Sequence, residues 1–488
     1  MTNASLRELR QAIAAIPADV SNDAVGAHAP KLEDIFAPAS HAAALDPSVP
    51  IVVGSRGAGK SFWSGVLGQE ATRSAASIAY PNLGLDKVVV GFGFTGAVGG
   101  ELGVTPEMLD SLVPPESGAA EAKAFWWATV LRAAARAKGD PIPKWRDAQS
   151  TAKNWEQREE ELQSYDRYFE SKQISLLVVY DALDTVASTW SRRRILTETL
   201  MEVVWGLRAY RRLKPKLFLR PDQIDDDALR FVELPKLRTG AVRLSWTKAD
   251  LYGLLYARMF LTNSSQSKKS FEDAIRGLSI SVPDHSAVLS RGWTLTYDVA
   301  QQSSVMTMLA GPYMADGVNG HKKGRTYDWP FKHLADAFDE VTPRSFLGLM
   351  IAAAGYGAVP SDKAITPEGI RHGLRAASKT RVDQLHQDFP WIKGVLAPLA
   401  GLLLPQSDKE VFRAWRATHT VKLLIADAKQ NRYLPPFDAS PVINDERPLL
   451  IALMRIGVMF VRKDGRVDMP DLFRVAAKLL KKGGTTPS

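Results

Sequence analysis

Cysteine is absent from this chain of 488 residues. Disulfide bonds, thiolate metal sites and cysteine nucleophiles are therefore excluded, and the composition agrees with a reducing compartment. The eight histidines are scattered without metal-ligand spacing, so we expect no zinc site. No combination of serine and histidine resembles the nucleophile elbow of a hydrolase.

Long apolar runs are also missing. The richest stretch, near Val395–Leu404, is shorter than the about 18 residues that suggest a membrane span, and Pro398 and Gly401 interrupt it. The first residues include Arg7 and Glu8 and lack the basic, apolar and small-residue order of a secretory signal. We therefore expect a cytoplasmic protein that is not exported and does not span a membrane.

The sequence does contain abundant apolar residues and an excess of positive charge. With 45% hydrophobic residues, a chain of this length suits two or three domains. The net charge of +9 and the pI near 9.4 favour a polyanionic partner such as nucleic acid. The alternative is that the charge is only spread along the chain.

Patterns along the chain divide it into five segments. The first contains a short helix near Leu6–Ile16, and the second alternates β-rich apolar runs with amphipathic helical stretches. Three mainly helical segments follow. The expected segments are an N-terminal arm over 1–46, an α/β core over 47–235, a helical lid over 236–350, a helical region over 351–440 and a winged-helix-like unit over 441–488.

The second segment predicts an α/β fold with a parallel sheet flanked by helices, because alternating strands and helices form crossover connections. A long segment, 97–172, separates its second and third strands and holds Phe125, Trp126 and Trp127, which we interpret as core residues. The expected strands are Pro50–Val53, Lys87–Phe94, Ile174–Tyr180 and Lys216–Leu219.

A phosphate-binding loop follows the first strand. The residues Gly54-Ser55-Arg56-Gly57-Ala58-Gly59-Lys60-Ser61 fit the pattern G-x-x-x-x-G-K-[ST] between an apolar strand and a helix. The glycines let backbone N–H groups surround a β-phosphate at a helix N-terminus. Lys60 is expected to reach the β- and γ-oxygens, and the Ser61 hydroxyl is expected to ligate Mg²⁺. We predict that ATP and Mg²⁺ are bound by Gly54, Arg56, Gly57, Ala58, Gly59, Lys60, Ser61 and Phe62.

The second half of such a site needs an acid at the end of a neighbouring buried strand. Asp181 follows the aliphatic run Ile174–Tyr180 and is expected to hold the metal's water shell opposite Ser61. The next position, where a second acid would orient the attacking water, holds Ala182. Asp184 is either the catalytic acid that acts in its place or only a cap of the following helix.

Two further cationic positions are candidates for contact with the nucleotide. Arg220 ends the strand Lys216–Leu219 and would lie near the γ-phosphate if that strand neighbours the phosphate-binding loop. The alternative for Arg220 is a surface salt bridge. The run Arg192-Arg193-Arg194 is a solvated helix face, a nucleic-acid contact or an arginine finger.

The last segment is expected to form a winged helix. Its expected elements are a helix over Leu449–Ile456, strands over Val458–Val461 and Val467–Asp468, a turn at Asp464-Gly465 and a helix over Pro470–Leu480. Such a unit either contacts DNA or packs internally as a regulatory module. The candidate DNA contacts are Arg462, Lys463, Arg466, Lys478, Lys481 and Lys482.

A family resemblance follows from the phosphate-binding loop, the Val178–Asp184 strand and acid, the strand that ends at Arg220, and Thr342-Pro343-Arg344 ahead of an apolar helix. Together these resemble the AAA+/STAND branch of P-loop ATPases, which includes KAP-type and related bacterial ATPases. The resemblance covers roughly residues 47–350. It implies an α/β nucleotide domain, a helical lid and a C-terminal winged helix.

The resemblance also assigns roles. Arg220 looks like the sensor-one position, and Pro343 and Arg344 look like the lid motif that contacts the nucleotide. Ala182 departs from the family at a position that usually holds an acid, which bears on the rate of hydrolysis more than on ATP binding. Related ATPases suggest bacterial conflict systems, such as defence against phage, as the setting.

We therefore expect an ATPase that acts as a nucleotide-driven switch or motor subunit of a larger assembly, with protein partners or self-assembly. The alternative is a DNA-binding module with a regulatory nucleotide site. A small-molecule kinase would use the same loop, but the long helical C-terminal half argues against that class.

Overall fold

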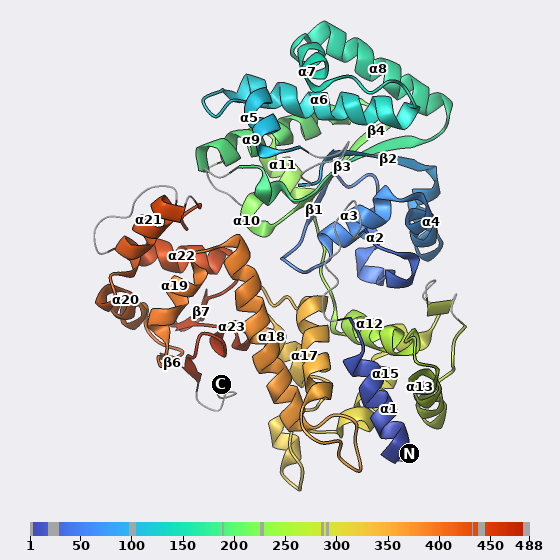
Figure 1. Ribbon diagram of the computed structural model, residues 1–488, viewed down its shortest axis with the longest axis vertical. Helices are drawn as coiled ribbons and strands as arrows, with labels where there is room; N and C mark the ends of the chain where they lie inside the picture. The colour runs from blue at the N-terminus through green and yellow to red at the C-terminus, as the bar shows by residue number, and fades with distance from the viewer. Residues whose placement is uncertain are drawn as a thin grey trace. The chain divides into compact units, whose positions relative to one another are not determined.

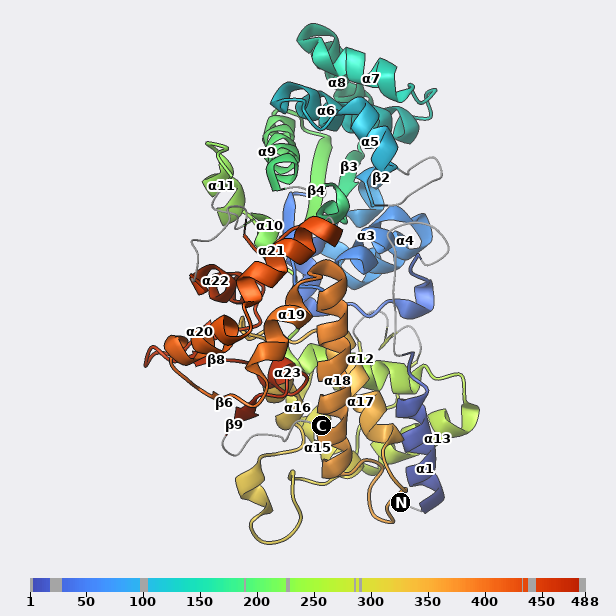
Figure 2. The ribbon, with the colours of Figure 1, turned by 60° about the vertical axis from the view of Figure 1, so that its left-hand side comes forward.

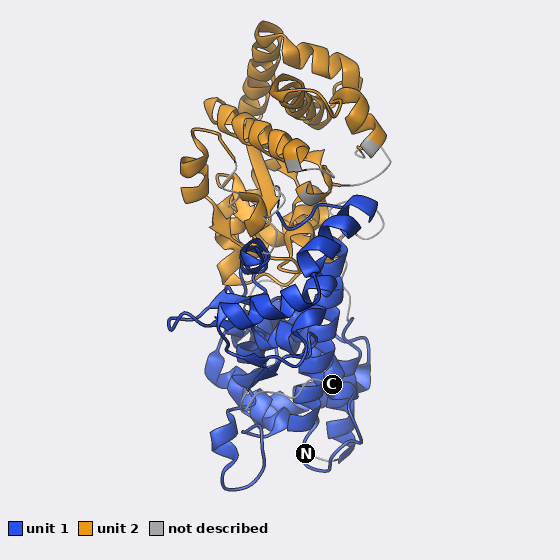
Figure 3. Ribbon diagram, turned by 90° about the vertical axis from the view of Figure 1, so that its left-hand side faces the viewer, with its two compact units in different colours: residues 1–20, 245–488 blue, residues 21–244 orange. Residues whose placement is uncertain are grey.

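The computed structural model describes residues 3–17, 29–96, 104–187, 190–224, 229–284, 287–288, 292–431, 433–437 and 445–481. The chain divides into two compact units (Figure 3). Residues 21–244 form the first, which we call the sheet unit, and residues 1–20 with 245–488 form the second, the helical unit. The five-segment division is finer than these two units and stays a prediction.

The sheet unit is built on five parallel strands in the order β2-β3-β4-β1-β5, which confirms the predicted parallel sheet. Val53 of β1 lies beside Leu219 of β4, and Tyr180 of β3 lies beside Leu217. The fifth strand contains two residues and was not predicted. The strands are β1 (Ile51–Val53), β2 (Val88–Phe94), β3 (Ser175–Tyr180), β4 (Leu213–Leu219) and β5 (Val242–Arg243).

Alternate residues of β3 face two different apolar cores. Leu176, Val178 and Tyr180 belong to one core, whereas Leu177 and Val179 belong to the other. A strand that is buried on both faces is apolar at nearly every position, which explains the continuous aliphatic run. Helices cover both faces (Figure 1). The helices are α2 (Ala42–Leu45), α3 (Lys60–Gly68), α4 (Glu70–Ala79), α5 (Pro106–Leu112), α6 (Ala119–Lys138), α7 (Trp145–Lys153), α8 (Trp155–Ser171), α9 (Trp190–Gly206), α10 (Pro221–Ile224) and α11 (Leu234–Thr239).

The long segment between β2 and β3 forms α5 to α8. Phe125, Trp126 and Trp127 of α6 are buried in the core against the sheet, as predicted. Nε1 of Trp126 donates a hydrogen bond of 2.8 Å to the carbonyl oxygen of Leu196, which ties α6 to α9. The α6 helix therefore forms the layer that covers one face of the sheet.

A buried lysine fastens the segment before β1 to the sheet. Nζ of Lys216, on β4, donates to the carbonyl oxygens of Ala44 at 3.0 Å, Asp46 at 2.6 Å and Val49 at 2.6 Å. Burial lowers the pKa of Lys216 to about 7, although the Asp46 carboxylate opposes this shift. All three carbonyl groups belong to residues 44–49, the segment that leads directly into β1.

The helical unit includes the N-terminal helix α1 (Asn3–Ala14), which packs against α13 and α17. The guanidinium group of Arg10 donates to the carbonyl oxygens of Tyr356 at 2.8 Å and Gly357 at 2.7 Å, just after α17 ends. The hydroxyl of Ser267 donates to the carboxylate of Glu8. These contacts join the first residues of the sequence to segments more than 250 positions away.

Two helices, α17 and α18, pack side by side in this unit (Figure 2). A Cβ atom added at Gly373 of α18 would lie 2.3 Å from the carbonyl oxygen of Leu349, so glycine permits the close approach. The sequence Thr247-Lys248-Ala249-Asp250 predicts a variant capping box ahead of a helix, and the structure confirms it at the start of α12. The other helices are α12 (Lys248–Phe260), α13 (Ser265–Gly277), α15 (Val299–Ala310), α16 (Trp329–Leu334), α17 (Pro343–Gly355), α18 (Pro367–Asp388), α19 (Ile392–Leu396), α20 (Asp408–Ala417), α21 (Thr420–Asn431), α22 (Arg447–Arg455) and α23 (Asp471–Arg474).

Short strands complete the helical unit. β6 (Leu403–Leu404) pairs in parallel with β9 (Leu480–Lys481), and β7 (Phe460–Val461) pairs antiparallel with β8 (Val467–Asp468). Of the helices that the structure describes, none combines the length and apolar composition needed to cross a membrane.

The buried lysine predicts a pH-dependent stability. Between about pH 7 and 10 the unfolded chain binds more protons at Lys216 than the folded chain does, so this residue makes the free energy of unfolding rise with pH. Lys216→Met should flatten that rise. It should also destabilise the protein at pH 9 by about 2–4 kcal/mol, because methionine cannot donate to the buried carbonyl groups that the amine of Lys216 reaches.

Urea unfolding of the full chain at several pH values measures both effects. Lys214→Met is the matched control, because Lys214 lies on the same strand and is only half-buried. An identical pH dependence for wild type and Lys216→Met would contradict the prediction.

Candidate functional site

The phosphate-binding loop lies between β1 and α3, as the sequence predicts. Gly57 and Gly59 have φ angles of 82° and 104°, a region that residues with a Cβ atom rarely adopt. Gly59 is the N-cap residue of α3, and Lys60 is its first residue. The glycines therefore let the chain turn from strand to helix with the helix N-terminus beside the loop.

Neighbouring strands hold the beginning of this loop. The Gly54 N–H donates to the carbonyl oxygen of Leu219 at 3.0 Å, which continues the pairing between β1 and β4. A Cβ atom at Gly54 would lie 3.3 Å from the Cβ atoms of both Ala58 and Leu244. The side of the loop that packs against β5 therefore has little room for a side chain.

The helix after the loop is anchored by a buried contact that sequence analysis missed. Nε1 of Trp63 donates to Nδ1 of His41 at 2.9 Å, and both side chains are buried. His41 ends a short 3₁₀ helix, Ala39–His41, in the segment before β1. This bond holds the buried side of α3 in place, three residues after Lys60.

The lysine of the loop contacts the loop itself. Nζ of Lys60 donates to the carbonyl oxygens of Gly54 at 2.8 Å and Ser55 at 3.1 Å. Ser61, in the first turn of α3, and Arg56 are partly exposed, whereas Ala58 is buried. Phe62 contacts the core below the loop and stacks edge-to-face on Trp63.

The predicted acid lies at the same edge of the sheet. Asp181 follows β3 and is 2% exposed, and its N–H donates to the carbonyl oxygen of Phe94 at 2.8 Å. Because β4 lies between β3 and β1, Asp181 and the loop are separated by two strand spacings, roughly 10 Å. That separation suits a carboxylate that acts through the water shell of a metal ion.

The residue after the acid has an unusual backbone. Ala182 has φ 53° and ψ 33°, the left-handed conformation, which costs roughly 1–2 kcal/mol for a residue with a Cβ atom. The Thr185 N–H and hydroxyl both donate to the Ala182 carbonyl oxygen and close a tight turn, Leu183–Thr185. Asp184 lies in this turn, but its side chain is outside the described residues.

Arg220 follows β4, and β4 pairs with β1, the strand that leads into the phosphate-binding loop. Arg220 therefore ends a strand that neighbours the loop, as a contact with the γ-phosphate requires. The residue is 7% exposed. Nε and Nη2 donate to the two carboxylate oxygens of Asp222 at 3.1 and 3.2 Å. The predicted surface salt bridge is therefore a buried pair instead, and contact with a nucleotide stays a prediction.

The three consecutive arginines of α9 are not a solvated face. Arg192 pairs with Asp110 at 2.7 Å and also donates to the Val113 carbonyl oxygen at 2.9 Å. Arg193 is 7% exposed and donates to Asp222 at 3.4 Å. At least two of these side chains thus have partners within the sheet unit.

The predicted lid motif lies in the helical unit. Pro343 and Arg344 begin α17, and the Thr342 hydroxyl caps this helix by accepting from the Ser345 N–H at 3.3 Å. This confirms the expected helix start, while the contact of Pro343 and Arg344 with nucleotide stays a prediction.

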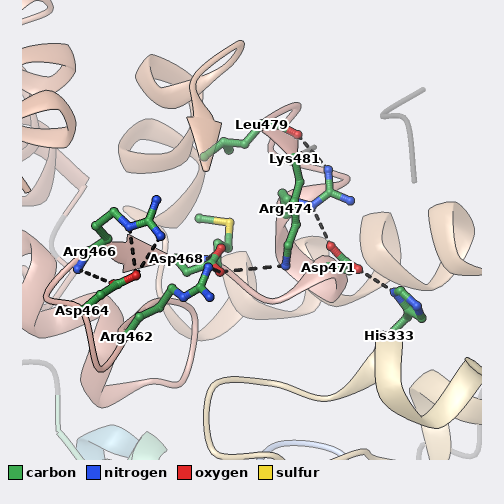
Figure 4. Close-up of polar contacts among 10 residues, drawn as sticks. His333, Arg462, Asp464, Arg466, Asp468, Asp471, Arg474, Leu479 and Lys481 are labelled. Atoms are coloured by element: carbon green, nitrogen blue, oxygen red, sulfur yellow. Dashed lines mark hydrogen bonds and ion pairs between the residues drawn. The ribbon is translucent and has the colours of Figure 1, made fainter. Parts of the chain in front are cut away.

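The final segment differs from the predicted winged helix. Its first helix, hairpin and turn are present, but helix α23 covers only Asp471–Arg474, so the predicted helix Pro470–Leu480 is wrong. The chain turns at Lys478, which has φ 58°, and continues as β9. The buried guanidinium of Arg474 donates to the Leu479 carbonyl oxygen at 3.0 Å and so stabilises this turn (Figure 4).

Carboxylates pair with three of the six candidate DNA-contact residues (Figure 4). Arg466 donates to Asp464 at 3.0 and 2.7 Å, while Arg462 and Lys481 lie 3.7 and 3.9 Å from the buried Asp468. Lys463 and Lys478 are also in the described chain, whereas Lys482 lies outside the described residues.

A second acid of this segment, Asp471, also has basic partners. Asp471 accepts from Arg474 at 2.7 Å and contacts Nδ1 of His333 at 2.6 Å. Burial opposes ionisation of Asp471, but the hydrogen bond from His333 and the Arg474 charge hold its pKa well below the usual range. These pairs account for the fold of the C-terminal segment.

The connections of the sheet locate the loop at a favourable position for a ligand. The helices between β1 and β2 cover one face, whereas those that follow β3 and β4 cover the other. The carboxyl ends of β1 and β4 are therefore the topological switch point of the sheet, the place where ligands bind in open α/β sheets. Among described residues no cluster of three histidine or acidic side chains is arranged to hold a metal ion.

The arrangement fits a nucleoside triphosphate with Mg²⁺. Two glycines in the left-handed region, an ammonium group at the first turn of α3, a hydroxyl beside it and a buried acid two strands away are the required donors and ligands. The strand order, the loop and the acid together define an α/β P-loop fold.

The chain has weak similarity to proteins of known structure. No protein-family model and no curated protein sequence matches the chain. It is similar to the ORC2 protein of Aeropyrum pernix, solved in ADPNP and ADP complexes, with TM-score 0.37, 13% identity and coverage of 88% of this chain and 87% of that chain. It is also similar to the Walker-type ATPase PABY2304 of Pyrococcus abyssi, with TM-score 0.39, 12% identity and coverage of 92% and 97%. The fold class rests on the loop and the sheet described above.

The left-handed glycine at the start of α3 gives a direct test of the loop. Gly59→Ala should weaken binding of a non-hydrolysable ATP analogue by about tenfold or more, because the backbone must leave φ 104° and the N–H groups lose their arrangement. Calorimetric titration measures the affinity, and thermal unfolding checks that the protein is folded.

Gly465→Ala is the matched control. Gly465 has φ 81° in the turn between β7 and β8, with no atom within 4 Å of an added Cβ atom. It imposes a similar backbone penalty outside the candidate site. Equal affinities for Gly59→Ala and Gly465→Ala would contradict the role of the loop.

Proposed function

We propose that this chain binds ATP with Mg²⁺ through Gly54–Ser61, hydrolyses ATP, and acts as a nucleotide-driven switch or motor subunit of a larger assembly. The observation that carries the proposal is the phosphate-binding loop at the carboxyl end of β1, with Asp181 and Arg220 at the same edge of the sheet.

Each residue of the site has a defined task in this proposal. Lys60 leaves the carbonyl groups of Gly54 and Ser55 and neutralises the β- and γ-oxygens. Ser61 and Asp181 hold Mg²⁺, the first directly and the second through water; bound Mg²⁺ offsets the charge that develops on the phosphates. Arg220 supplies a further positive charge near the γ-phosphate.

Hydrolysis also needs a group that orients the attacking water, and we assign this task to Asp184. The left-handed Ala182 and the bonds from Thr185 to its carbonyl oxygen bring the chain into a tight turn directly after Asp181. A carboxylate in that turn is within the same short segment as the metal-binding acid. This supports Asp184 as the acid that replaces the one missing at position 182.

The helical unit is the part that we expect to respond to the nucleotide. In the proposal, Pro343 and Arg344 at the start of α17 contact the bound nucleotide and convert its state into a change of that unit. Partner proteins or further copies of this chain read the change. The family resemblance further suggests the KAP-like or STAND branch, with defence against phage as the setting.

DNA is a less favoured partner. The basic residues that suggested it include Arg462, Arg466 and Lys481, and each lies within 4 Å of a carboxylate of the same unit. Paired cations release fewer counterions from a polyanion. If the protein is retained on duplex DNA in the absence of nucleotide, and this retention weakens steeply with salt, the DNA-binding alternative would be supported.

Two substitutions separate binding from hydrolysis. Lys60→Ala should weaken ATP binding by about a hundredfold, because the phosphates lose their main cation. Asp184→Asn should leave the affinity unchanged and lower kcat by about 10²–10⁴, because the water is no longer oriented. Steady-state ATP turnover and calorimetric titration measure the two quantities.

Asp86→Asn is the control, because it neutralises an exposed acid in a 3₁₀ turn of the same unit. Particle size by light scattering, with and without ATP analogue, tests the switch. Unaltered affinity in Lys60→Ala would end the proposal, and unaltered turnover in Asp184→Asn would end the assignment of Asp184.

A further inference from the structure

We propose that His41 is a positioning residue for the phosphate-binding loop. By accepting the hydrogen bond of Trp63, it fixes the first turn of α3, which contains Lys60 and Ser61. This inference rests on the proposed function, because a bound triphosphate is what makes the position of that turn matter. His41 lies outside the phosphate-binding motif, in the segment that precedes β1.

Trp63 connects His41 to the loop itself. Its backbone N–H donates to the carbonyl oxygen of Gly59 at 3.0 Å. Its ring lies beside the same residue, because a Cβ atom added at Gly59 would be 3.9 Å from Cδ1 of the indole. Ala58 of the loop is buried in the same core as Trp63. A displacement of this indole therefore displaces the loop residues that precede Lys60.

The hydrogen bond to His41 specifies the orientation of the indole. Trp63 is 1% exposed, and its Nε1–H donates to Nδ1 of His41 at 2.9 Å. An indole N–H can only donate, so Nδ1 carries no proton and acts as the acceptor. The rings of His41, Phe62 and Tyr80 pack against the indole edge-to-face, with centroids 5.8, 5.2 and 6.3 Å away. Ring contacts tolerate small rotations, whereas a hydrogen bond weakens steeply when its angle changes.

The segment that carries His41 is fastened on both sides of this residue. The hydroxyl of Tyr80 donates to the carbonyl oxygen of Pro38 at 2.6 Å, three residues before His41. After it, Lys216 of β4 holds the three carbonyl groups of residues 44–49, directly before β1. One segment therefore holds both the strand that enters the phosphate-binding loop and the helix that leaves it.

Contacts with phosphate depend on this fixed spacing. Lys60 and Ser61 must reach oxygens whose places are set by the backbone of Gly54–Gly59, and errors of about 0.5 Å weaken such contacts. Without an acceptor at Nδ1, the buried indole N–H would be unsatisfied, so the indole or α3 would move until another acceptor reaches it. Nucleotide binding would then have to restore the first turn of α3, which lowers the affinity.

The test compares two substitutions of His41 by calorimetric titration of the full chain with a non-hydrolysable ATP analogue and Mg²⁺. In His41→Asn the acceptor Oδ1 is bonded to Cγ, as Nδ1 is in histidine, so it stays where the indole needs it. In His41→Gln the acceptor is one bond further from the backbone. We expect His41→Gln to weaken binding by about tenfold and His41→Asn by less than about threefold.

A residue that only fills space would give the opposite order, because glutamine is closer than asparagine to histidine in volume. Binding by His41→Asn that is as weak as that by His41→Gln, or weaker, would therefore overturn the inference.

Trp63→Phe removes the donor and keeps an aromatic ring. It should weaken binding of the analogue about as much as His41→Gln does. In the Trp63→Phe background, His41→Gln should cause no further loss, because it acts through the indole N–H. Additive losses in the double variant would contradict the proposal. If His41→Gln is unfolded, Trp63→Phe alone decides, and an unchanged affinity in that variant would contradict the proposal as well.

Thr72→Val is the matched control. The buried hydroxyl of Thr72 donates to the carbonyl oxygen of Val66 at 2.8 Å, in the last turn of α3. Its loss should lower the temperature of thermal unfolding, as His41→Gln does, but change the affinity by less than about twofold. Equal weakening by both substitutions would make His41 a structural residue and overturn the inference. Failure of the proposed function gives a different result, in which wild type does not bind the analogue or Lys60→Ala binds like wild type.

Discussion

The pairing of β1 with strands on both sides is the constraint on which the candidate site depends. β1 has only three residues, yet Leu217 donates to the Pro50 carbonyl oxygen, Gly54 donates to that of Leu219, and Leu244 donates to that of Val53. A strand held at both edges cannot shift its register without losing bonds to two neighbours. The first residue of the phosphate-binding loop therefore starts from a fixed position, and the loop needs little stabilisation of its own.

Local chemistry explains what could be predicted from the sequence. The loop was found because its glycines, lysine and serine act within eight consecutive residues, and the capping box at Thr247 because its two partners are three positions apart. The buried strand β3 was found because burial on both faces leaves a continuous apolar run. Only Lys216–Leu219 of β4 was predicted, because Lys214 and Pro215 interrupt the apolar pattern of its first residues. In each case the interactions that determine the structure lie within one short segment of the sequence.

Long-range contacts explain what could not be predicted. β5 has two residues and no apolar run, and only its pairing with β1 makes it a strand. The acceptors of Lys216 lie about 170 positions earlier, and Trp63 meets His41 from another element. The predicted helix after Pro470 ends at Arg474 because Leu480 and Lys481 pair with Leu403 and Leu404, a contact that outweighs helix propensity there.

The buried basic residues of the sheet unit have two kinds of partner. Lys216 donates to three backbone carbonyl oxygens, and burial lowers its pKa to about 7. Arg220 and Arg193 both donate to the carboxylate of Asp222, so each of these guanidinium groups has an acidic partner within the unit. Burial alone therefore does not mark a functional basic residue, because all three side chains have partners that satisfy buried polar groups and stabilise the fold.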